Sequence, residues 1–374
     1  MQKLNKTLLY DNIDRIAQYD FSKNKVFGSA YYVYQEDSLD FEKCYGRISL
    51  NSDTPVTKHT LFRLASMTKP ITAVATLILV DQGRLSLEDT VDKFLPNFKS
   101  ISVVDSLGNR FKPINMPTVR NILSHCAGIA SNYSKLDDMT AKDRETIDAS
   151  IAYYINKGLD YEPGTAQMYS ATGAFDVLVK IIEIVTGTAF PDFLQEVIFE
   201  PCKMENTTFA PTALQKENMI KMHQLLDGEN SEFKMPEGCV FERFPYAHYL
   251  GGAGLASTLS DYCNFAKMLL NKGSIDGKKI ISEETFNQLC TPQVSKDIMN
   301  NDYLWGLGVR VISDDSYPYL PVGTYGWSGA YGSHFWIDPE NRIFAVYMKN
   351  SKFDGGAANE SGKNLEKAVY SALE

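Results

Sequence analysis

Strand-like segments lie near both ends of this 374-residue chain, and helix-like segments fill its middle. Residues 26–34 and 44–50 read as two β-strands separated by a polar turn, which predicts a hairpin. Strand-like runs return at residues 306–312, 333–337 and 343–348, and an Asp-Pro-Glu-Asn turn separates the last two. Strands at both chain ends indicate one sheet built from both termini, with the middle of the chain as an insertion.

The middle of the chain predicts a mostly helical lobe with long, irregular connections. Helices are predicted at residues 68–83, 119–126, 144–156, 174–186, 261–271 and 362–373, and residues 1–20 carry apolar side chains at helical spacing. We therefore expect an α/β lobe formed by residues 1–95 and 250–374 and a helical lobe formed by residues 96–249. The cleft between two such lobes is the natural place for a ligand.

The composition is that of a globular protein without a nucleic-acid partner. The formal net charge is −9 and no polybasic segment occurs, whereas phosphate binding needs clustered Lys and Arg. No run of about 18 apolar residues appears, so no membrane span is expected. The first twenty residues lack the apolar core of a signal peptide, which predicts a cytoplasmic location. The oligomeric state stays open.

Neither the cysteines nor the histidines form a metal-binding pattern. No cysteines form a C-x-x-C pair, and no histidines show H-x-x-x-H or H-x-x-E-H spacing. A chain of this length can bury a large core without disulfides or metals. We therefore expect no metal and no cofactor, and reduced, mostly buried cysteines. The cysteines are Cys44, Cys126, Cys202, Cys239, Cys263 and Cys290.

The Ser-x-x-Lys pattern offers a candidate nucleophile. Residues i and i+3 share one helix face, so a serine at a helix start lies beside the lysine one turn later. The helix N-terminus also presents free N–H groups to a developing oxyanion. A lysine can act as a base only when burial and neighbouring cations lower its pKa. The pattern occurs at Ser22–Lys25, Ser66–Lys69 and Ser231–Lys234.

Only Ser66 has a context that favours catalysis. Ser22 and Ser231 lie in polar segments typical of solvated loops. Ser66 precedes ITAVATLILV, the most apolar helix-like run in the chain, and Pro70 fits the first turn of that helix. The alternative for Ser66 is a plain helix N-cap.

Two further segments contain candidate site residues. Tyr169 precedes a predicted helix, and a phenol close to a lysine ammonium is stabilised as a phenolate that could relay the serine proton. A packed tyrosine with a satisfied hydroxyl is the alternative. Gly326, Gly329 and Gly332 allow close backbone approach beside a strand, where a second oxyanion N–H could lie, or they form an ordinary glycine-rich hairpin. The G-x-S-x-G elbow of α/β-hydrolases is absent.

Taken in order, these segments resemble the serine β-lactamase and penicillin-binding-protein superfamily. The likeness lies in LFRLASMTKPITAVATLILVDQGRLSLEDTVDKFLPNF, TVRNILSHCAGI, GGAGLASTLSDYCNFAKMLLNKG and GWSGAYGSHFWIDPE. It covers roughly residues 25–370 and is nearest to class C β-lactamases and family VIII carboxylesterases. The resemblance implies a β-lactamase-like α/β fold, with a central antiparallel sheet flanked by helices and an inserted helical lobe.

The resemblance also implies roles for individual residues. Ser66 matches the nucleophile, Lys69 its paired lysine, and Tyr169 the tyrosine of the Y-x-N motif. The backbone N–H groups of Ser66 and Ala330 match the two donors of the oxyanion hole. The implied reaction is covalent acyl transfer, in which Ser66 attacks a carbonyl, Lys69 and Tyr169 move the proton, and water releases the acyl group.

Two departures from the family pattern bear on the substrate. Residues 169–171 read Tyr-Ser-Ala, so the amide that would contact a β-lactam side chain is missing. Trp327, Ser328 and Gly329, which are expected to contact substrate, stand where β-lactamases have K-T-G, so the cation for a β-lactam carboxylate is missing. Both departures favour a small carboxylic ester over a β-lactam. The alternatives are a β-lactamase or D-Ala-D-Ala peptidase, and an acyltransferase or non-hydrolytic binding member.

Overall fold

One antiparallel sheet with strands from both chain ends forms the centre of the protein, as predicted. The computed structural model describes residues 2–234, 248–299, 301–356 and 359–374, so Cys239 lies outside the described residues. The strand order is β12-β13-β14-β15-β16-β1-β2-β3. In chain order these strands are β1 (Gly28–Gln35), β2 (Leu39–Ser49), β3 (Ser52–Pro55), β12 (Tyr303–Trp305), β13 (Arg310–Ile312), β14 (Tyr325–Ser328), β15 (His334–Asp338) and β16 (Ile343–Met348).

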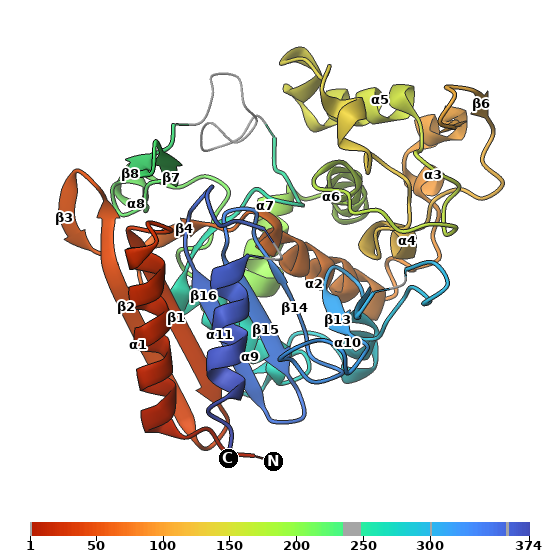
Figure 1. Cartoon of the computed structure of the whole chain (residues 1–374). Helices are drawn as coiled ribbons and strands as arrows, with labels where there is room; N and C mark the ends of the chain where they lie inside the picture. Colours follow the sequence, from red (N-terminus) through yellow and green to blue (C-terminus); the bar gives the residue numbers. More distant parts are fainter. Residues whose placement is uncertain (1, 235–247, 300, 357–358) are drawn as a thin grey trace.

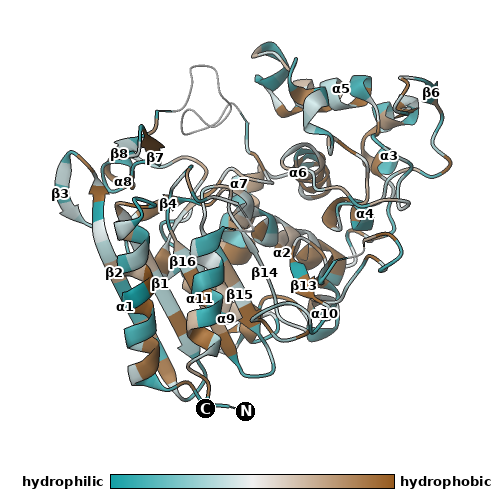
Figure 2. Cartoon of the chain, viewed as in Figure 1, coloured by the Kyte–Doolittle hydropathy of each residue, from teal (hydrophilic) through white to brown (hydrophobic). Residues whose placement is uncertain are grey.

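Helices cover both faces of this sheet (Figure 1). On one face α1 (Lys6–Ser22) and α11 (Glu360–Tyr370) lie side by side, and the two chain ends meet beside them. Figure 2 shows hydrophilic residues on the outward sides of both helices. On the opposite face α9 (Leu259–Leu270) packs against β15 and β16. The sheet is therefore the middle layer of three, and each of its faces borders a separate apolar core.

The most apolar segment of the sequence forms α2 (Thr68–Asp81), which is buried on nearly every side. It packs against α6 (Gly173–Thr186) and α10 (Glu283–Leu289). The hydroxyl of Thr72 donates to the backbone carbonyl of Gly251, so this polar group is satisfied inside the core. A helix that is apolar all round must be enclosed by protein, and α2 accordingly carries its first turn into the interior.

Most of the predicted helical lobe surrounds α6. A single apolar cluster includes Val74 of α2 and Val179 of α6, so the core is continuous from the sheet side into this lobe. The division of the chain at residues 95 and 250 stays a prediction. The other helices and strands before α9 are β4 (Leu61–Arg63), α3 (Val91–Phe94), β5 (Val103–Val104), β6 (Arg110–Phe111), α4 (Val119–Leu123), α5 (Ile147–Lys157), α7 (Phe190–Leu194), α8 (Ala213–Glu217), β7 (His223–Leu226), β8 (Glu229–Glu232) and β9 (Ala256–Thr258).

The last part of the predicted helical lobe lies beside the sheet instead. In Figure 1, α8, β7 and β8 lie next to β2 and β3, away from α5. Lys221 donates its N–H to the carbonyl of Ile48 in β2, and His223 donates its N–H to the carbonyl of Asn350. Backbone pairing thus attaches this segment to the α/β side of the molecule.

A buried polar network joins the sheet to α11. Glu366 accepts hydrogen bonds from Arg310 Nη2 at 2.8 Å, from His334 Nε2 at 2.8 Å and from the Tyr317 hydroxyl at 3.2 Å. Burial lowers the pKa of His334, so the neutral ring donates through Nε2 and accepts from the Ser328 hydroxyl at Nδ1, at 2.7 Å. This network ties β13, β14 and β15 to one helix, and its only anion is Glu366.

Loss of one partner from this network should destabilise the fold. Arg310→Met leaves the Glu366 carboxylate, which is 1% exposed, without its cation, and should cost about 3 kcal/mol in the free energy of unfolding. The double variant Arg310→Met/Glu366→Met removes both charges and should recover much of that loss. Urea denaturation measures both.

The exposed pair Lys272–Glu283 supplies the control for this prediction. Its side chains are 51% and 60% exposed, so Lys272→Met should change the free energy of unfolding by less than about 0.5 kcal/mol. A cost for Arg310→Met no larger than that of Lys272→Met would contradict the role given to the buried network.

Candidate active site

Ser66 lies in a strained turn at the entrance to α2. The strand β4 pairs with β9, and a single 3₁₀ turn at Ala65–Met67 then leads into the helix. Ala65 has φ = +45°, a left-handed conformation that a residue with a side chain adopts at a cost. Ser66 is half-buried and does not cap α2, whose N-cap position is Met67 without a side-chain bond. The N-cap alternative for Ser66 is therefore not what the structure shows.

Lys69 is fully enclosed one turn after Ser66. Its Nζ donates to the backbone carbonyl of Ala171 at 2.5 Å and to that of Gly252 at 2.9 Å. Burial lowers the pKa of Lys69 to about 7, and the carboxylate of Asp176 acts in the opposite direction. Near neutral pH a substantial fraction of Lys69 is therefore unprotonated and able to accept a proton.

Tyr169 lies beside both Lys69 and Ser66. Its hydroxyl accepts the indole N–H of Trp327 at 3.2 Å, and the nearby Ser66 side chain lowers the pKa of its phenol. Lys69 Nζ lies over the Tyr169 ring, 4.7 Å from its centroid. Burial raises the pKa of the Tyr169 phenol, and the bonds with Ser66 and Trp327 oppose that rise only in part. The resting phenol is therefore neutral, in contrast to the phenolate expected from the sequence.

Aromatic rings enclose Tyr169 on several sides. The centroids of His125 and Trp327 lie 4.5 Å and 5.4 Å from that of Tyr169, and Trp305 stacks on it at 5.7 Å. His125 Nδ1 accepts the backbone N–H of Ser170, and burial, with a smaller effect of the Lys69 charge, holds its pKa well below the ordinary value. A neutral, apolar wall of this kind excludes water from the proton-transfer groups.

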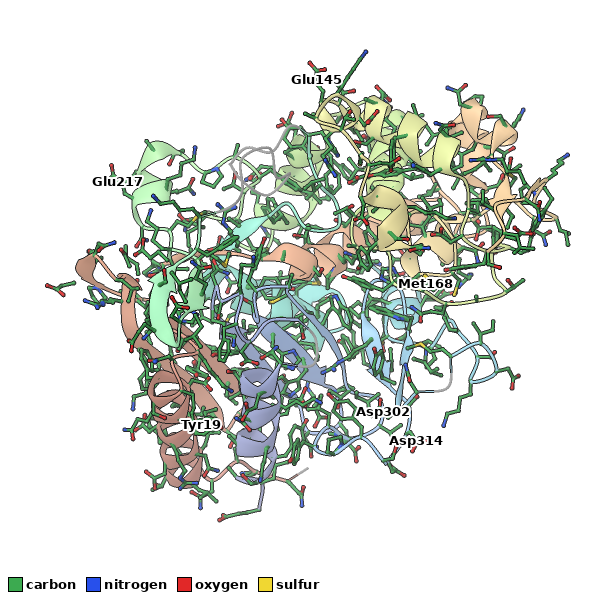
Figure 3. The ribbon with its side chains drawn as sticks, turned by 45° about the horizontal axis from the view of Figure 1, so that its top comes forward. Tyr19, Glu145, Met168, Glu217, Asp302 and Asp314 are labelled. Atoms are coloured by element: carbon green, nitrogen blue, oxygen red, sulfur yellow. The ribbon has the colours of Figure 1, made fainter. Side chains whose placement is uncertain are left out.

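Sequence reasoning missed His125 and Trp305 as parts of this wall. His125 stands in TVRNILSHCAGI, a segment quoted for the family likeness, but its spacing to Tyr169 gives no signal of contact. Trp305 ends β12, far along the chain from α6. Figure 3 places Met168, the neighbour of Tyr169, between the helical elements around α5 and the segment of Asp302.

The strand β14 brings Trp327 to the site but turns Ser328 away from it. Neighbouring residues of a strand point to opposite faces, and Ser328 bonds to His334 in the network behind the sheet. Ser328 is 2% exposed, so its hydroxyl does not face a substrate as the sequence led us to expect. A Cβ at Gly329 would meet the carbonyl of Leu64 at 2.5 Å, so this glycine allows β14 to approach the Ser66 turn.

Ala330 follows β14 in an exposed turn. The preceding Gly329 brings that turn against the carbonyl of Leu64, two residues before Ser66. The structure thus brings the segments that carry the two expected oxyanion donors, Ser66 and Ala330, next to each other.

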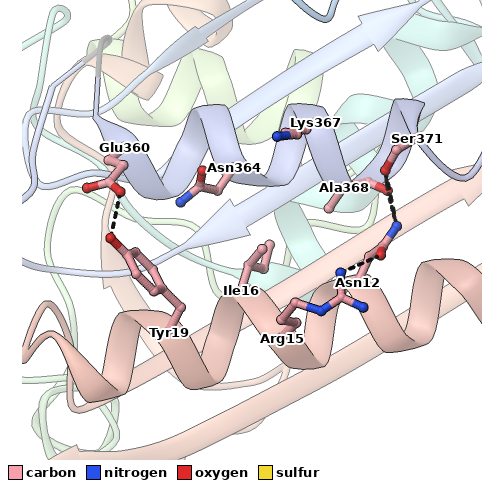
Figure 4. A pocket seen from close by; sticks show the side chains of 9 residues that line it. All are labelled: Asn12, Arg15, Ile16, Tyr19, Glu360, Asn364, Lys367, Ala368 and Ser371. Carbon is pink, nitrogen blue, oxygen red and sulfur yellow. Dashed lines mark hydrogen bonds between the residues drawn. The ribbon is translucent and has the colours of Figure 1, made fainter.

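One cavity lies beside the candidate site residues, and one groove lies away from them. A cavity of about 190 Å³ is lined by Ala171, Thr172 and Leu250, and Ala171 is the residue whose carbonyl binds Lys69. A groove of about 320 Å³ lies between α1 and α11 (Figure 4), on the opposite face of the sheet from Trp327. None of the candidate site residues lines that groove.

The described residues contain no metal-binding group. Within residues 2–234, 248–299, 301–356 and 359–374, no cluster of three or more His, Cys, Asp or Glu side chains could hold a metal ion. No helix in the same ranges has the length and apolar character needed to cross a membrane.

Comparison with known proteins identifies the family. The family model described as Beta-lactamase matches residues 13–369. The chain belongs to the beta-lactamase family. It is thus a serine hydrolase of this family, in agreement with the arrangement of Ser66, Lys69 and Tyr169.

Its relatives include proteins of several descriptions. Protein Rv1367c of Mycobacterium tuberculosis is 27% identical over 344 residues, which cover 86% of this chain and 85% of the relative. Esterase EstB of Burkholderia gladioli is 24% identical and covers 94% and 93% of the two chains. The solved structure of EstCE1, described as a hydrolase with promiscuous acyltransferase activity, has a TM-score of 0.83 at 24% identity and covers 97% and 99%. The last similarity shows a shared fold.

The buried lysine predicts the pH dependence of the reaction. Below pH 7 Lys69 binds a proton and can no longer accept one, so kcat/KM should fall as pH falls, by about tenfold per pH unit well below the pKa. Above pH 7 the profile should level off. Hydrolysis of p-nitrophenyl butyrate between pH 5 and 9 checks this. A flat profile across that range would show that Lys69 is not the titrating base.

The hydrogen bond from Trp327 predicts a second kinetic effect. The indole N–H favours negative charge on the Tyr169 oxygen, which would develop if the Tyr169 phenol gave its proton to Lys69 during the reaction. Trp327→Phe keeps an aromatic ring and removes the donor, so kcat should fall about tenfold, the effect of roughly 1.4 kcal/mol. Steady-state kinetics with p-nitrophenyl butyrate measures it. A folded variant with wild-type kcat would show that the bond does not assist the chemistry.

Proposed function

We propose that this protein hydrolyses small carboxylic esters through a covalent acyl-enzyme on Ser66. The observation that supports this most strongly is the grouping of three side chains: a fully buried Lys69 with a pKa of about 7, the Tyr169 ring 4.7 Å from its Nζ, and Ser66 beside the Tyr169 phenol. A serine, a relay and a base with a matched pKa are the parts that acyl transfer needs.

In the proposed reaction the proton passes between these three side chains. Ser66 Oγ attacks the ester carbonyl while its proton passes to the Tyr169 oxygen and the Tyr169 proton passes to Lys69. The backbone N–H groups of Ser66 and Ala330 bind the oxyanion that forms. Lys69 and Tyr169 then return a proton to the departing alkoxide, which leaves as the alcohol. A water molecule attacks the acyl-enzyme by the same route and releases the carboxylic acid and free Ser66.

Two features support a neutral ester as substrate. Trp327 is 6% exposed and uses its N–H on Tyr169, so it offers no cation to a carboxylate. The cavity beside Ala171, of about 190 Å³, is lined mostly by apolar and aromatic side chains, among them Leu136 and Met139, with Arg144 and His248 also on its wall. A short acyl chain fits these dimensions.

The proposal predicts ester hydrolysis that depends on Ser66. Short-chain p-nitrophenyl esters should be turned over with a kcat/KM at least about tenfold above that for nitrocefin, because an anionic β-lactam lacks a charge-assisted bond here. Ser66→Ala should abolish both turnover and labelling by a fluorophosphonate probe, observed by intact-mass spectrometry.

The other two Ser-x-x-Lys serines are matched controls. Ser22→Ala and Ser231→Ala should keep both ester hydrolysis and a single fluorophosphonate adduct. Labelling that persists in Ser66→Ala would refute the nucleophile. Efficient nitrocefin hydrolysis with much slower ester hydrolysis would instead support the β-lactamase alternative. Acyl transfer to an added alcohol at the expense of hydrolysis would support the acyltransferase alternative.

A further inference from the structure

The two expected oxyanion donors belong to segments far apart in the chain. Ser66 follows β4, and Ala330 follows β14, so the two residues are 264 positions apart in the sequence. An oxyanion hole works only when both N–H groups keep the spacing that the developing anion requires. Some other part of the protein must therefore hold these two segments in one geometry.

The side chain of Asn350 holds the Ser66 side of this pair. Its Oδ1 accepts the backbone N–H of Arg63 at 2.9 Å, and its Nδ2 donates to the backbone carbonyl of the same residue at 3.0 Å. The same Nδ2 donates to the carbonyl of Lys349 at 2.7 Å. Asn350 is 2% exposed and follows β16 by two residues. It therefore binds β4 as another strand would, through both backbone groups of one residue.

The residue that Asn350 holds, Arg63, lies two residues before the strained Ala65 of the turn. Ala65, with φ = +45°, stands between Arg63 and the nucleophile. A residue in this conformation persists only when the surrounding structure fixes it. The two hydrogen bonds from Asn350 fix the backbone at Arg63, on the β4 side of Ala65. The direction of the Ser66 N–H therefore depends on these bonds.

The residues just after Asn350 hold the Ala330 side. Ser351 donates its N–H to the carbonyl of Tyr331 at 2.9 Å. Gly355 lies against the carbonyl of Ala330 so closely that an added Cβ would be only 2.2 Å from that oxygen. The chain from Asn350 to Gly355 thus contacts both segments of the expected oxyanion hole within six residues.

We propose that the 350–355 segment is a clamp that sets the distance between the two oxyanion N–H groups, with Asn350 as its main positioning residue. The clamp does not touch the substrate. It acts on the tetrahedral state through the backbone of Arg63 and Ala330, and it leaves the binding of the intact ester nearly unchanged. The inference rests on the proposed function, because it assigns a task to the oxyanion hole of that reaction.

Two variants disturb the clamp from opposite sides. Asn350→Leu keeps a side chain of similar size and removes both bonds to Arg63. Gly355→Ala keeps those bonds and places a methyl group against the Ala330 carbonyl. Since they act on different segments, a folding defect in one variant leaves the other as a test.

Asn12→Leu is the matched control. Asn12 is also buried, and its Nδ2 donates to the Ala368 carbonyl and the Ser371 hydroxyl between α1 and α11, across the sheet from Ser66. Its loss removes a comparable pair of bonds without touching either oxyanion segment.

The test compares the transition state with the ground state. For each variant, active sites are counted by fluorophosphonate adduct mass, and kcat and KM for p-nitrophenyl butyrate are measured per active site. The Ki of phenylboronic acid, which forms a tetrahedral adduct on a serine Oγ, is measured in parallel. Both clamp variants should lose about ten- to a hundredfold in kcat, with KM changed less than about threefold. The Ki for phenylboronic acid should rise in parallel, whereas Asn12→Leu should keep all three values.

The outcomes separate this inference from the proposed function. Folded clamp variants with wild-type kcat and Ki, in a protein whose ester hydrolysis needs Ser66, would overturn the clamp alone. Equal losses in the clamp variants and in Asn12→Leu would also overturn it, because they would reflect general destabilisation. A wild-type protein without Ser66-dependent ester hydrolysis would overturn both proposals.

Discussion

The burial of Lys69 is the constraint on which the rest of the site depends. A lysine ammonium in an apolar interior is costly, and the protein meets part of that cost with two backbone carbonyls and part by lowering the pKa of the amine to about 7. The carbonyls belong to Ala171, before α6, and to Gly252, before α9. Lys69 therefore reaches its working state only when the segments around α6 and α9 pack onto α2. The same packing of these segments therefore closes the core and lowers the pKa of Lys69.

A second buried network gives the strand opposite Lys69 a fixed position. Glu366 on α11 binds Arg310 and His334, and His334 binds Ser328, so three adjacent strands share one anion. Ser328 lies directly between Trp327, which binds Tyr169, and Gly329, which touches the Ser66 turn. Residues on the far face of the sheet thus influence the site through the strand itself, because moving Ser328 must move its neighbours. Buried polar groups of this kind rigidify a fold when every member is satisfied.

The sequence predicted the sheet, the apolar helix α2 and the family, because these depend on local pattern and on motifs with fixed spacing. The run ITAVATLILV and the hairpin of β1 and β2 required no knowledge of distant contacts. Asn350 and Trp305 could not be found in this way, since each acts across more than 130 residues and carries no motif. The orientation of Ser328 could have been predicted from the sequence, because neighbouring residues of a strand point to opposite faces of the sheet and Trp327 points to the site. The phenolate expected at Tyr169 was wrong in direction, because burial raises the pKa of the phenol by more than Ser66 and Trp327 lower it.

In the proposed reaction, the charge state of the site would also discriminate between substrates. With Tyr169 neutral and His125 held neutral, Lys69 is a group beside Ser66 whose charge changes near pH 7, and Asp176 already raises its pKa. A substrate carboxylate bound near Ser66 would add a second anion, and a nearby anion favours the charged ammonium. Each unit of rise in the pKa of Lys69 would protonate the base about tenfold more at a pH above that pKa. A neutral ester would leave the pKa of Lys69 unchanged. An anionic β-lactam would raise that pKa and so favour the protonated form of Lys69, which cannot accept the proton of Ser66. Under the proposed function, the absence of a lysine at position 327 would therefore act together with the low pKa of Lys69, and both would disfavour an anionic substrate.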